Sequence, residues 1–420
     1  MKKITTTLNW PHIRLRLSFE IRRIQNKGVV YIFHKSVAKL IGVGLWFILL
    51  PLTVLLHLAG YRRATVFTDR IGHLALEPDC LLKEQALGHI PKRKWIMLAP
   101  PNRTANEHLL NYWQPHFIIL RHPLLCYLIR SMSLWLLLRY DISHYILATG
   151  KAQASYRIFS EWGNNPPILK LSPEDEQWGA AKLKELGLPE GVWFVCVHVR
   201  EPGFSTIDEE LHAHRNGSIE NTIPAIQAII DLGGWVIRIG DSTMTPLKTM
   251  HQVIDYAHHQ LKSSRMDIIL CAKTRFLLGN SSGISLVSTV FGVPSALANM
   301  IPISALALGI KDVSMHKTLW STQLDRYLTF SEIMTSPMAN FNHPALYKDF
   351  NIELKENSAQ DIKRLTNKML ELSTSPDKSL SEIQLKHMAM FLPHHYGYGA
   401  TNTLLQANPN TYLDTTDTVE

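Results

Sequence analysis

Apolar runs without strict alternation recur along this chain, and amphipathic segments lie between them, as in parallel sheets that helices cover on both faces. We expect buried strands at Trp193–Arg200, Trp235–Asp241 and Ile268–Leu278. Isoleucine recurs at helical spacing within Ser218–Asp231, and a short helix is expected over Ile284–Phe291. This order of strand, helix and strand predicts a right-handed parallel α/β unit.

The best-marked helix in the sequence precedes these strands, within Leu171–Gly187. Ser172 is a candidate N-cap, and Pro173 suits the first helical position. The acidic residues that follow suit the positive end of the helix dipole, and Gly187 suits the C-terminal end.

The N-terminal half of the chain predicts a second α/β unit. We expect strands at Ala64–Thr68 and Trp95–Ala99 and a helix at about Glu77–Leu87. The apolar stretch Phe117–Leu138, which contains arginines, predicts a pair of core helices. Its alternative is an extended membrane-facing surface, because arginine side chains snorkel at interfaces.

Positive charge concentrates at the N-terminus. The 420 residues include 43 basic and 35 acidic side chains, with a formal net charge of +8. The first 40 residues hold nine basic side chains and one acidic side chain, Glu20, so the rest of the chain balances to zero. We therefore expect a basic arm that suits an anionic lipid surface, and not a nucleic-acid-binding body.

A hydrophobic segment follows this arm. Leu40–Tyr61 comprises 22 residues without a charged side chain, which is long enough to cross a bilayer. Pro51 lies in its middle, and Arg62 and Arg63 follow it. Positive charge on both flanks favours a kinked re-entrant or interfacial segment that keeps the remaining chain in the cytoplasm. An ordinary single span is the alternative.

Several other function classes lack their signatures. The four cysteines are scattered without the spacing of a zinc site or a disulfide framework, so we expect free thiols and no bound metal. The sequence contains no Walker loop, no GxGxxG and no serine-hydrolase elbow.

Candidate ligand-binding residues follow the strands. Within Gly279–Pro294, small residues stand where a strand turns into a helix, and backbone N–H groups there favour a phosphate. These residues are Ser281, Ser282 and Gly283. The two neighbouring strands end in His198, Arg200, Arg238, Gly240 and Asp241. Because ligands bind beyond the carboxyl ends of parallel strands, we expect these residues around one crevice.

Three of these residues have structural alternatives. His198 could donate to a phosphate or satisfy a backbone group. Asp241 could contact the nucleoside or sugar hydroxyls, or it could cap a turn. Arg238 could pair with Asp267.

Two α/β units facing a cleft predict a GT-B-like α/β fold with two Rossmann-like domains and an N-terminal membrane-associating helical segment. The basic arm and membrane segment are expected at 1–62, and an acceptor-side domain at 63–167. A donor-side domain with its closing helix is expected at 171–373, and a partly disordered tail at 374–420. The chain has no Asp-x-Asp pair, so arginine and backbone donors would neutralise a diphosphate.

Taken together, these motifs resemble a family of bacterial glycosyltransferases of surface-polysaccharide synthesis and, more distantly, the fucosyltransferase-like superfamily. The resemblance covers roughly Arg63 to Leu370. It rests on RIGHLALEPD at 70–79, HVR at 198–200, HRN at 214–216, RIGD at 238–241, GNSSG at 279–283, FGVP at 291–294, and LWS and ENS near Leu319 and Asn357.

The resemblance implies that Arg200 binds the donor diphosphate and that Ser281, Ser282 and Gly283 line the diphosphate pocket. The alternative for Arg200 is an ion pair with Glu201 or Glu220. Many fucosyltransferases have a second basic residue where this chain has Glu201, which argues against GDP-fucose and leaves the sugar open.

Inverting sugar transfer needs a base within hydrogen-bond reach of the acceptor hydroxyl. The candidates are Asp69, His73, Glu201 and His214. The long polar loop at 201–217 is a candidate lid over the acceptor.

The sequence therefore predicts a metal-independent glycosyltransferase on the cytoplasmic side of the inner membrane, with a nucleotide sugar as co-substrate and no other cofactor. Expected partners are this donor, a lipid-linked or growing glycan acceptor, the membrane surface and other polysaccharide-assembly proteins, but no nucleic acid. A nucleotide-sugar epimerase and a non-catalytic scaffold of a polysaccharide assembly complex are the alternatives.

Overall fold

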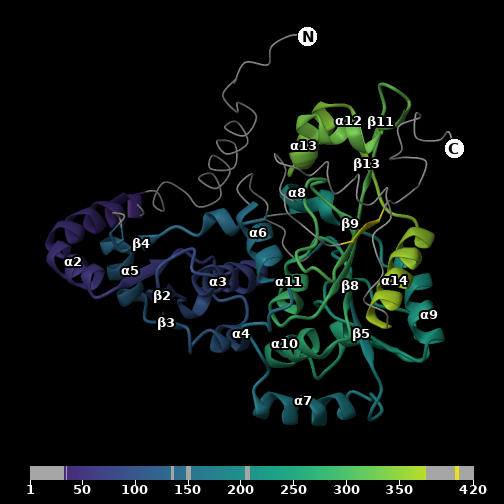
Figure 1. Ribbon diagram of the computed structural model, residues 1–420, viewed down its shortest axis with the longest axis horizontal. Helices are drawn as coiled ribbons and strands as arrows, with labels where there is room; N and C mark the ends of the chain where they lie inside the picture. The colour runs from purple at the N-terminus through teal and green to yellow at the C-terminus, as the bar shows by residue number, and fades with distance from the viewer. Residues whose placement is uncertain are drawn as a thin grey trace. The chain divides into compact units, whose positions relative to one another are not determined.

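The computed structural model describes residues 33–34, 36–133, 137–147, 153–203, 209–374 and 403–405. The chain forms two compact units. Unit 1 comprises residues 1–64, 93–101 and 118–140, and unit 2 comprises 65–92, 102–117 and 141–420. Each unit contains a parallel sheet (Figure 1).

Unit 1 is built on a four-stranded sheet in the order β3-β2-β1-β4. Its strands are β1 (Tyr61–Ala64), β2 (Lys94–Leu98), β3 (Phe117–Leu120) and β4 (Arg139–Tyr140). β1 runs parallel to both β2 and β4. The helix α5 (Pro123–Met132) packs on the sheet, where Cys126 meets Ile96 and Leu98.

Two helices of unit 1 come from the hydrophobic segment. They are Ser36–Ile48 and α2 (Leu50–Leu58), and they are bent by 64° relative to each other. Pro51 stands in the first turn of α2, where its missing N–H costs nothing. The kink expected at Pro51 is therefore confirmed. Neither helix is long and apolar enough to cross a membrane alone, and the two together have only the length and composition of a broken span or a re-entrant loop.

Unit 2 is built on a seven-stranded sheet in the order β14-β10-β9-β8-β5-β6-β7, and every neighbouring pair is parallel. Its strands are β5 (Phe194–His198), β6 (Trp235–Arg238), β7 (Val253–Asp255), β8 (Leu277–Gly279), β9 (Ser295–Met300), β10 (Val313–His316) and β14 (Thr403–Leu405). Every residue of β5, β8 and β9 is buried, which explains their apolar runs without alternation.

Helices cover both faces of this sheet (Figure 1). α9 (Ile223–Asp231) and α14 (Ala359–Thr374) pack side by side on one face. α10 (Ser264–Lys273) and α11 (Gly283–Val290) cover the other face, and α3 (Ile71–Ala86) packs against α11.

Unit 2 contains further helices along the chain. They are α4 (Glu107–Tyr112), α6 (Gln153–Trp162), α7 (Pro173–Glu185), α8 (Glu209–His212), α12 (Phe330–Met334) and α13 (Pro344–Asp349). A separate antiparallel sheet in the order β12-β11-β13 consists of β11 (Thr318–Ser321), β12 (Arg326–Tyr327) and β13 (Ile352–Lys355).

Several expected elements are confirmed. β5, β6, α9 and α11 lie within or close to the segments predicted for them. α7 begins as expected, because Oγ of Ser172 accepts a hydrogen bond from the backbone N–H of Asp175 at 3.1 Å.

The strand expected over Ile268–Leu278 is wrong for most of its length. α10 extends to Lys273, and β8 begins only at Leu277. Oγ of Ser263 caps this helix by accepting from the N–H of Met266 at 3.2 Å. A helix that is apolar on most sides has little amphipathic period, so its sequence resembles a buried strand.

Three further boundaries need correction. The strand expected at Ala64–Thr68 ends at Ala64, and the expected helix pair at Phe117–Leu138 begins with the strand β3. α3 begins at Ile71 and not near Glu77, since Pro78 lies inside it and imitates a helix start. The closing helix expected at the end of 171–373 begins at Ala359, after β13.

The expected domain division stays a prediction. The boundary expected between residues 167 and 171 lies within unit 2. The basic arm at 1–32 and most of the tail at 374–420 lie outside the described residues.

Candidate functional site

The sheet of unit 2 reverses its direction of growth between β5 and β8. From β5 the chain adds β6 and β7 on one side, and it then crosses over to add β8, β9 and β10 on the other side. Ligands bind beyond the carboxyl ends of the strands at such a switch point. The segments that follow β5 and β8 are therefore the candidate site, as the strand-end motifs predicted.

His198 and Ser282 link these two strand ends. Nδ1 of the buried His198 lies 3.1 Å from the carbonyl oxygen of Ile239, which can only accept, so Nδ1 carries the proton. Burial lowers the pKa of His198 to about 4. The ring is therefore neutral, and Nε2 accepts from Oγ of Ser282 at 2.9 Å. His198 thus satisfies a backbone group and orients Ser282, which leaves neither nitrogen to donate to a phosphate.

Arg200 follows β5 and joins it to the β8 turn. Its backbone N–H donates to Oδ1 of Asn280 at 3.0 Å. Its guanidinium donates to Oδ1 of Asn216 and lies 3.8 Å from Oε2 of Glu209. The acidic neighbour of Arg200 is therefore Glu209, and not either glutamate that the sequence suggested.

Arg215 belongs to the same cluster, although we did not single it out from the sequence. Its guanidinium donates twice to the carbonyl oxygen of Ser281, at 2.8 and 2.5 Å. Burial and the nearby charges of Arg200 and Arg70 lower the pKa of Arg215 to about 10. A bound anion would favour the charged form of Arg215, which its like-charged neighbours disfavour. In the sequence, Arg215 is the middle residue of the HRN segment at 214–216, of which only His214 is a predicted site residue.

Two helix N-termini meet beside these arginines. A Cβ on Gly72 would lie 2.8 Å from Cα of Gly283, and a Cβ on Gly283 would lie 2.9 Å from the backbone nitrogen of Gly72. Gly283 begins α11, and Gly72 is in the first turn of α3. Both helices therefore bring free N–H groups and positive dipole ends to the same region. Arg70, the N-cap residue of α3, adds a further positive charge.

His73 lies next to Gly72 and forms a pair with Glu77 one turn along α3. Its Nδ1 hydrogen-bonds to Oε1 of Glu77, whose side chain is buried, whereas His73 is 28% exposed. Burial raises the pKa of Glu77, against the opposing effect of this hydrogen bond. A carboxylate that fixes Nδ1 leaves Nε2 of the ring able to accept a proton.

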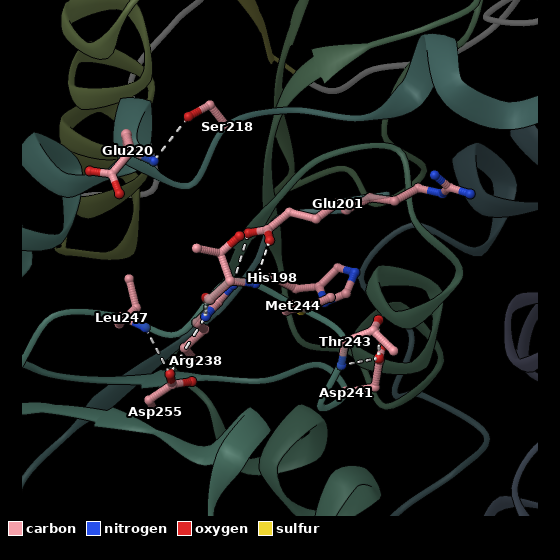
Figure 2. Close-up of polar contacts among 12 residues, drawn as sticks. His198, Glu201, Ser218, Glu220, Arg238, Asp241, Thr243, Met244, Leu247 and Asp255 are labelled. Atoms are coloured by element: carbon pink, nitrogen blue, oxygen red, sulfur yellow. Dashed lines mark hydrogen bonds and ion pairs between the residues drawn. The ribbon is translucent and has the colours of Figure 1, made fainter. Parts of the chain in front are cut away.

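Glu201 and Arg238 form a buried ion pair, and Figure 2 shows their side chains facing each other. Arg238 donates to Oε1 of Glu201 at 2.8 Å, and Oε2 accepts from the backbone N–H of Thr245 at 2.7 Å. Arg238 is fully buried and lies 3.6 Å from Asp255, so its expected pairing with Asp267 is wrong. These contacts favour a structural role for both residues over catalysis or donor binding.

Asp241 and Gly240 shape the turn after β6. Oδ1 of Asp241 accepts from the backbone N–H of Thr243 at 2.9 Å, as Figure 2 shows, so Asp241 caps a turn. A Cβ on Gly240 would lie 2.1 Å from Sδ of Met244, so a larger residue there would have to displace the Met244 side chain.

The other two candidate bases have different surroundings. Oδ2 of Asp69 lies 3.2 Å from the guanidinium of Arg103, and both side chains are exposed. His214 is buried, and its Nδ1 has no hydrogen-bond partner. Burial and the charges of Arg215, His212 and Lys317 lower the pKa of His214 to about 3, which makes it a weak base.

In the described part of the chain, no group of three or more His, Cys, Asp or Glu side chains could hold a metal ion.

No family model matches the sequence, and no curated protein matches it. Among solved structures, the chain is similar to a glycosyl transferase of family 9 from Veillonella parvula, with 12% identity, a TM-score of 0.26, and coverage of 56% of this chain and 60% of that one. It is similar to the iron-containing dodecameric glycosyltransferase TibC of enterotoxigenic E. coli, with 12% identity, a TM-score of 0.34, and coverage of 57% and 58%. It is also similar to E. coli ADP-heptose LPS heptosyltransferase II, with 11% identity, a TM-score of 0.35, and coverage of 61% and 84%.

This chain covers less than two thirds of the length of the first two of these proteins. At these identities and TM-scores the likeness carries no argument about activity, so the geometry of the site has to carry it.

Proposed function

We propose that this protein is a glycosyltransferase that uses a nucleotide-sugar donor. The observation that carries the proposal is the switch point between β5 and β8, where Arg70, Arg200 and Arg215 surround the meeting N-termini of α3 and α11. A diphosphate is the ligand group that matches several fixed positive charges and a row of backbone N–H donors.

In this proposal the arginines bind the donor and stabilise the diphosphate as it leaves. Negative charge grows on the leaving group in the transition state, so preorganised cationic donors lower the barrier. Ser281, Ser282 and Gly283 supply backbone donors in the β8–α11 turn. Because these groups replace the charge of a cation, we expect transfer to continue in the presence of a metal chelator.

His73 is our choice for the base that removes the proton from the acceptor hydroxyl. It is partly exposed, its ring is oriented by Glu77, and its neighbour Gly72 touches the β8–α11 turn. Asp69, Glu201 and His214 remain weaker candidates, for the reasons given by their contacts.

We propose that the acceptor is a lipid-linked or growing surface glycan at the cytoplasmic face of the inner membrane. The support is the bent helix pair Ser36–Ile48 and Leu50–Leu58, which suits a re-entrant or interfacial segment. Assembly with other proteins of polysaccharide synthesis belongs to the same proposal. A reporter fused after Gly60 tests the topology, because periplasmic activity there contradicts a cytoplasmic body.

The donor is tested by thermal shift of the full-length protein with a panel of nucleotide sugars and nucleoside diphosphates. A ligand that binds only the native state raises the melting temperature. We expect one nucleotide class to stabilise the protein, and Arg200→Ala to abolish the shift. The matched control is Arg364→Ala, which removes an exposed arginine from α14.

Each outcome separates the candidate functions. The donor site is supported if the thermal shift with a nucleotide persists in Arg364→Ala and is lost in Arg200→Ala. Turnover of the donor without any acceptor favours an epimerase. If a folded protein shows no shift with any nucleotide, the scaffold alternative replaces our proposal.

A further inference from the structure

Unit 1 is almost free of acidic residues. Its three chain segments contain 16 lysines and arginines and one acidic residue, Glu20, whereas unit 2 contains 27 basic and 34 acidic residues. The described residues of unit 1 include no aspartate or glutamate at all. The described residues of unit 1 therefore bring positive charge to its sheet and to α5 without contributing a carboxylate of their own.

Three arginines gather where the sheet of unit 1 reverses direction. The chain adds β2 and β3 on one side of β1 and β4 on the other, so the switch point lies between β1 and β4. Arg63 of β1 and Arg139 of β4 are direct neighbours in the parallel register. A switch point with adjacent guanidinium groups is a suitable place for an anionic ligand.

Arg130 of α5 completes this cluster. Burial, followed by the charges of Arg130 and Arg139, lowers the pKa of Arg63 to about 10. Nε of Arg63 is buried and has no hydrogen-bond partner, whereas Arg130 and Arg139 are exposed. The cluster therefore joins an unsatisfied buried donor to two cations that a ligand can reach.

The same unit exposes many large apolar side chains. On α5, Cys126 faces the sheet, whereas Leu124 and Leu125 on the other side are 58% and 47% exposed. The helix Ser36–Ile48 rests on α5, because Oη of Tyr127 donates to the carbonyl oxygen of Ala38 at 2.6 Å. The helix pair exposes Leu40, Ile41, Phe47, Ile48, Leu52, Leu55 and Leu58. So many exposed apolar side chains indicate that this surface binds an apolar partner.

We propose that unit 1 docks on a bilayer and binds the phosphate of an anionic phospholipid at Arg63, Arg130 and Arg139. This inference deepens the membrane association proposed above and rests on it. One kind of partner satisfies both observations. The acyl chains cover the exposed leucines, and the phosphate accepts hydrogen bonds from Nε of Arg63 and from the neighbouring guanidinium groups. Guanidinium groups suit phosphate because they donate in a planar fork.

The test is co-flotation of the full-length protein, made by cell-free synthesis in the presence of vesicles. Vesicles of pure phosphatidylcholine are compared with vesicles that also contain phosphatidylglycerol. Each basic residue near an anionic surface contributes about 1 kcal/mol, so Arg130→Gln with Arg139→Gln should weaken binding to the anionic vesicles about thirty-fold. Binding to pure phosphatidylcholine should change little.

The matched control is Arg93→Gln with Lys94→Gln, which removes two exposed charges from the same unit. If this control loses as much affinity for anionic vesicles as the Arg130 and Arg139 variant, binding depends on the overall charge of the unit and the proposed site is wrong. Equal binding of the wild type to both kinds of vesicle also overturns the proposal. So does displacement by inorganic phosphate at constant ionic strength, because the site would then take free phosphate.

Failure here is distinguishable from failure of the donor site. Arg200→Ala should float with anionic vesicles like the wild type, and the Arg130 and Arg139 variant should keep the thermal shift with the nucleotide.

Discussion

At the scale of single residues, Arg215 is the reason why the candidate site suits an anion. Its guanidinium is held by the carbonyl of Ser281, which gives direction but no opposite charge. Arg70 and Arg200 are close enough to lower its pKa. A bound diphosphate would relieve this repulsion, so donor binding and charge balance are coupled at this point.

Glu201 and Arg238 illustrate a charged pair that serves folding. Glu201→Gln leaves the fully buried Arg238 with only the more distant Asp255, so we expect a loss of about 3 kcal/mol in the free energy of unfolding. Urea denaturation measures this loss. The control is Glu332→Gln, which breaks an exposed pair with Arg326 and should cost about 1 kcal/mol or less. Equal effects of the two variants would show that burial does not matter here.

His73 carries the prediction about chemistry. We expect His73→Asn to lower kcat by about 10²–10⁴ with little change in donor binding, because a general base acts on the acceptor and not on the nucleotide. Glu77→Gln should lower kcat less, since it only orients the ring. Initial rates with saturating donor and the thermal shift measure the two effects. Wild-type kcat in His73→Asn would exclude this residue as the base.

At the scale of elements, the contact between α3 and α11 brings two distant motifs together. RIGH begins α3 and NSSG begins α11, and their glycines allow backbone contact. The sequence separates them by about 200 residues, so no local pattern could reveal this contact.

Gly72→Ala tests this contact. The added Cβ would lie 2.8 Å from Cα of Gly283, so the two helices must separate, and we expect a loss of about 1–3 kcal/mol and weaker nucleotide binding. Gly44→Ala is the control, because a Cβ there meets nothing within 4 Å and alanine favours a helix. Unchanged nucleotide binding in a folded Gly72→Ala variant would contradict the role of the helix N-termini.

At the scale of the whole molecule, buried histidines make stability depend on pH. The ordinary pKa of 6.5 falls to about 4 at His198 and to about 3 at His214. Below pH 6.5 these histidines bind protons in the unfolded chain but stay neutral in the native state. The stabilisation from the two neutral histidines is therefore complete above pH 6.5 and is lost as the pH falls toward 4. Burial raises the pKa of Asp312 to about 7, which opposes this trend.

A double variant isolates the histidine effect. We expect His198→Gln with His214→Gln to remove the part of the acid destabilisation that the histidines cause, so that the unfolding free energy falls less, or even rises, as the pH is lowered from 6.5 to 4.5. Urea denaturation at several pH values measures both slopes. Identical slopes would show that other groups control acid stability.

The division of charge between the two units is also a property of the whole molecule. From the sequence, the chain is a basic N-terminal arm followed by a neutral remainder. The fold divides that remainder, since Arg93, Lys94, Arg121, Arg130 and Arg139 join unit 1 and most acidic residues belong to unit 2. A charge count along the sequence does not reveal this division, because the sequence does not show which segments share a sheet.

The sequence by itself determined the α/β class, the kink at Pro51, the strands β5 and β6 and the turn that precedes α11. These depend on local signals: apolar period, capping side chains, proline and glycine. Only the tertiary structure decided that Glu201 pairs with Arg238, that Arg215 joins Arg70 and Arg200, and that α10 is a helix. Those outcomes depend on burial and on contacts between distant segments, and neither is encoded in the spacing of neighbouring residues.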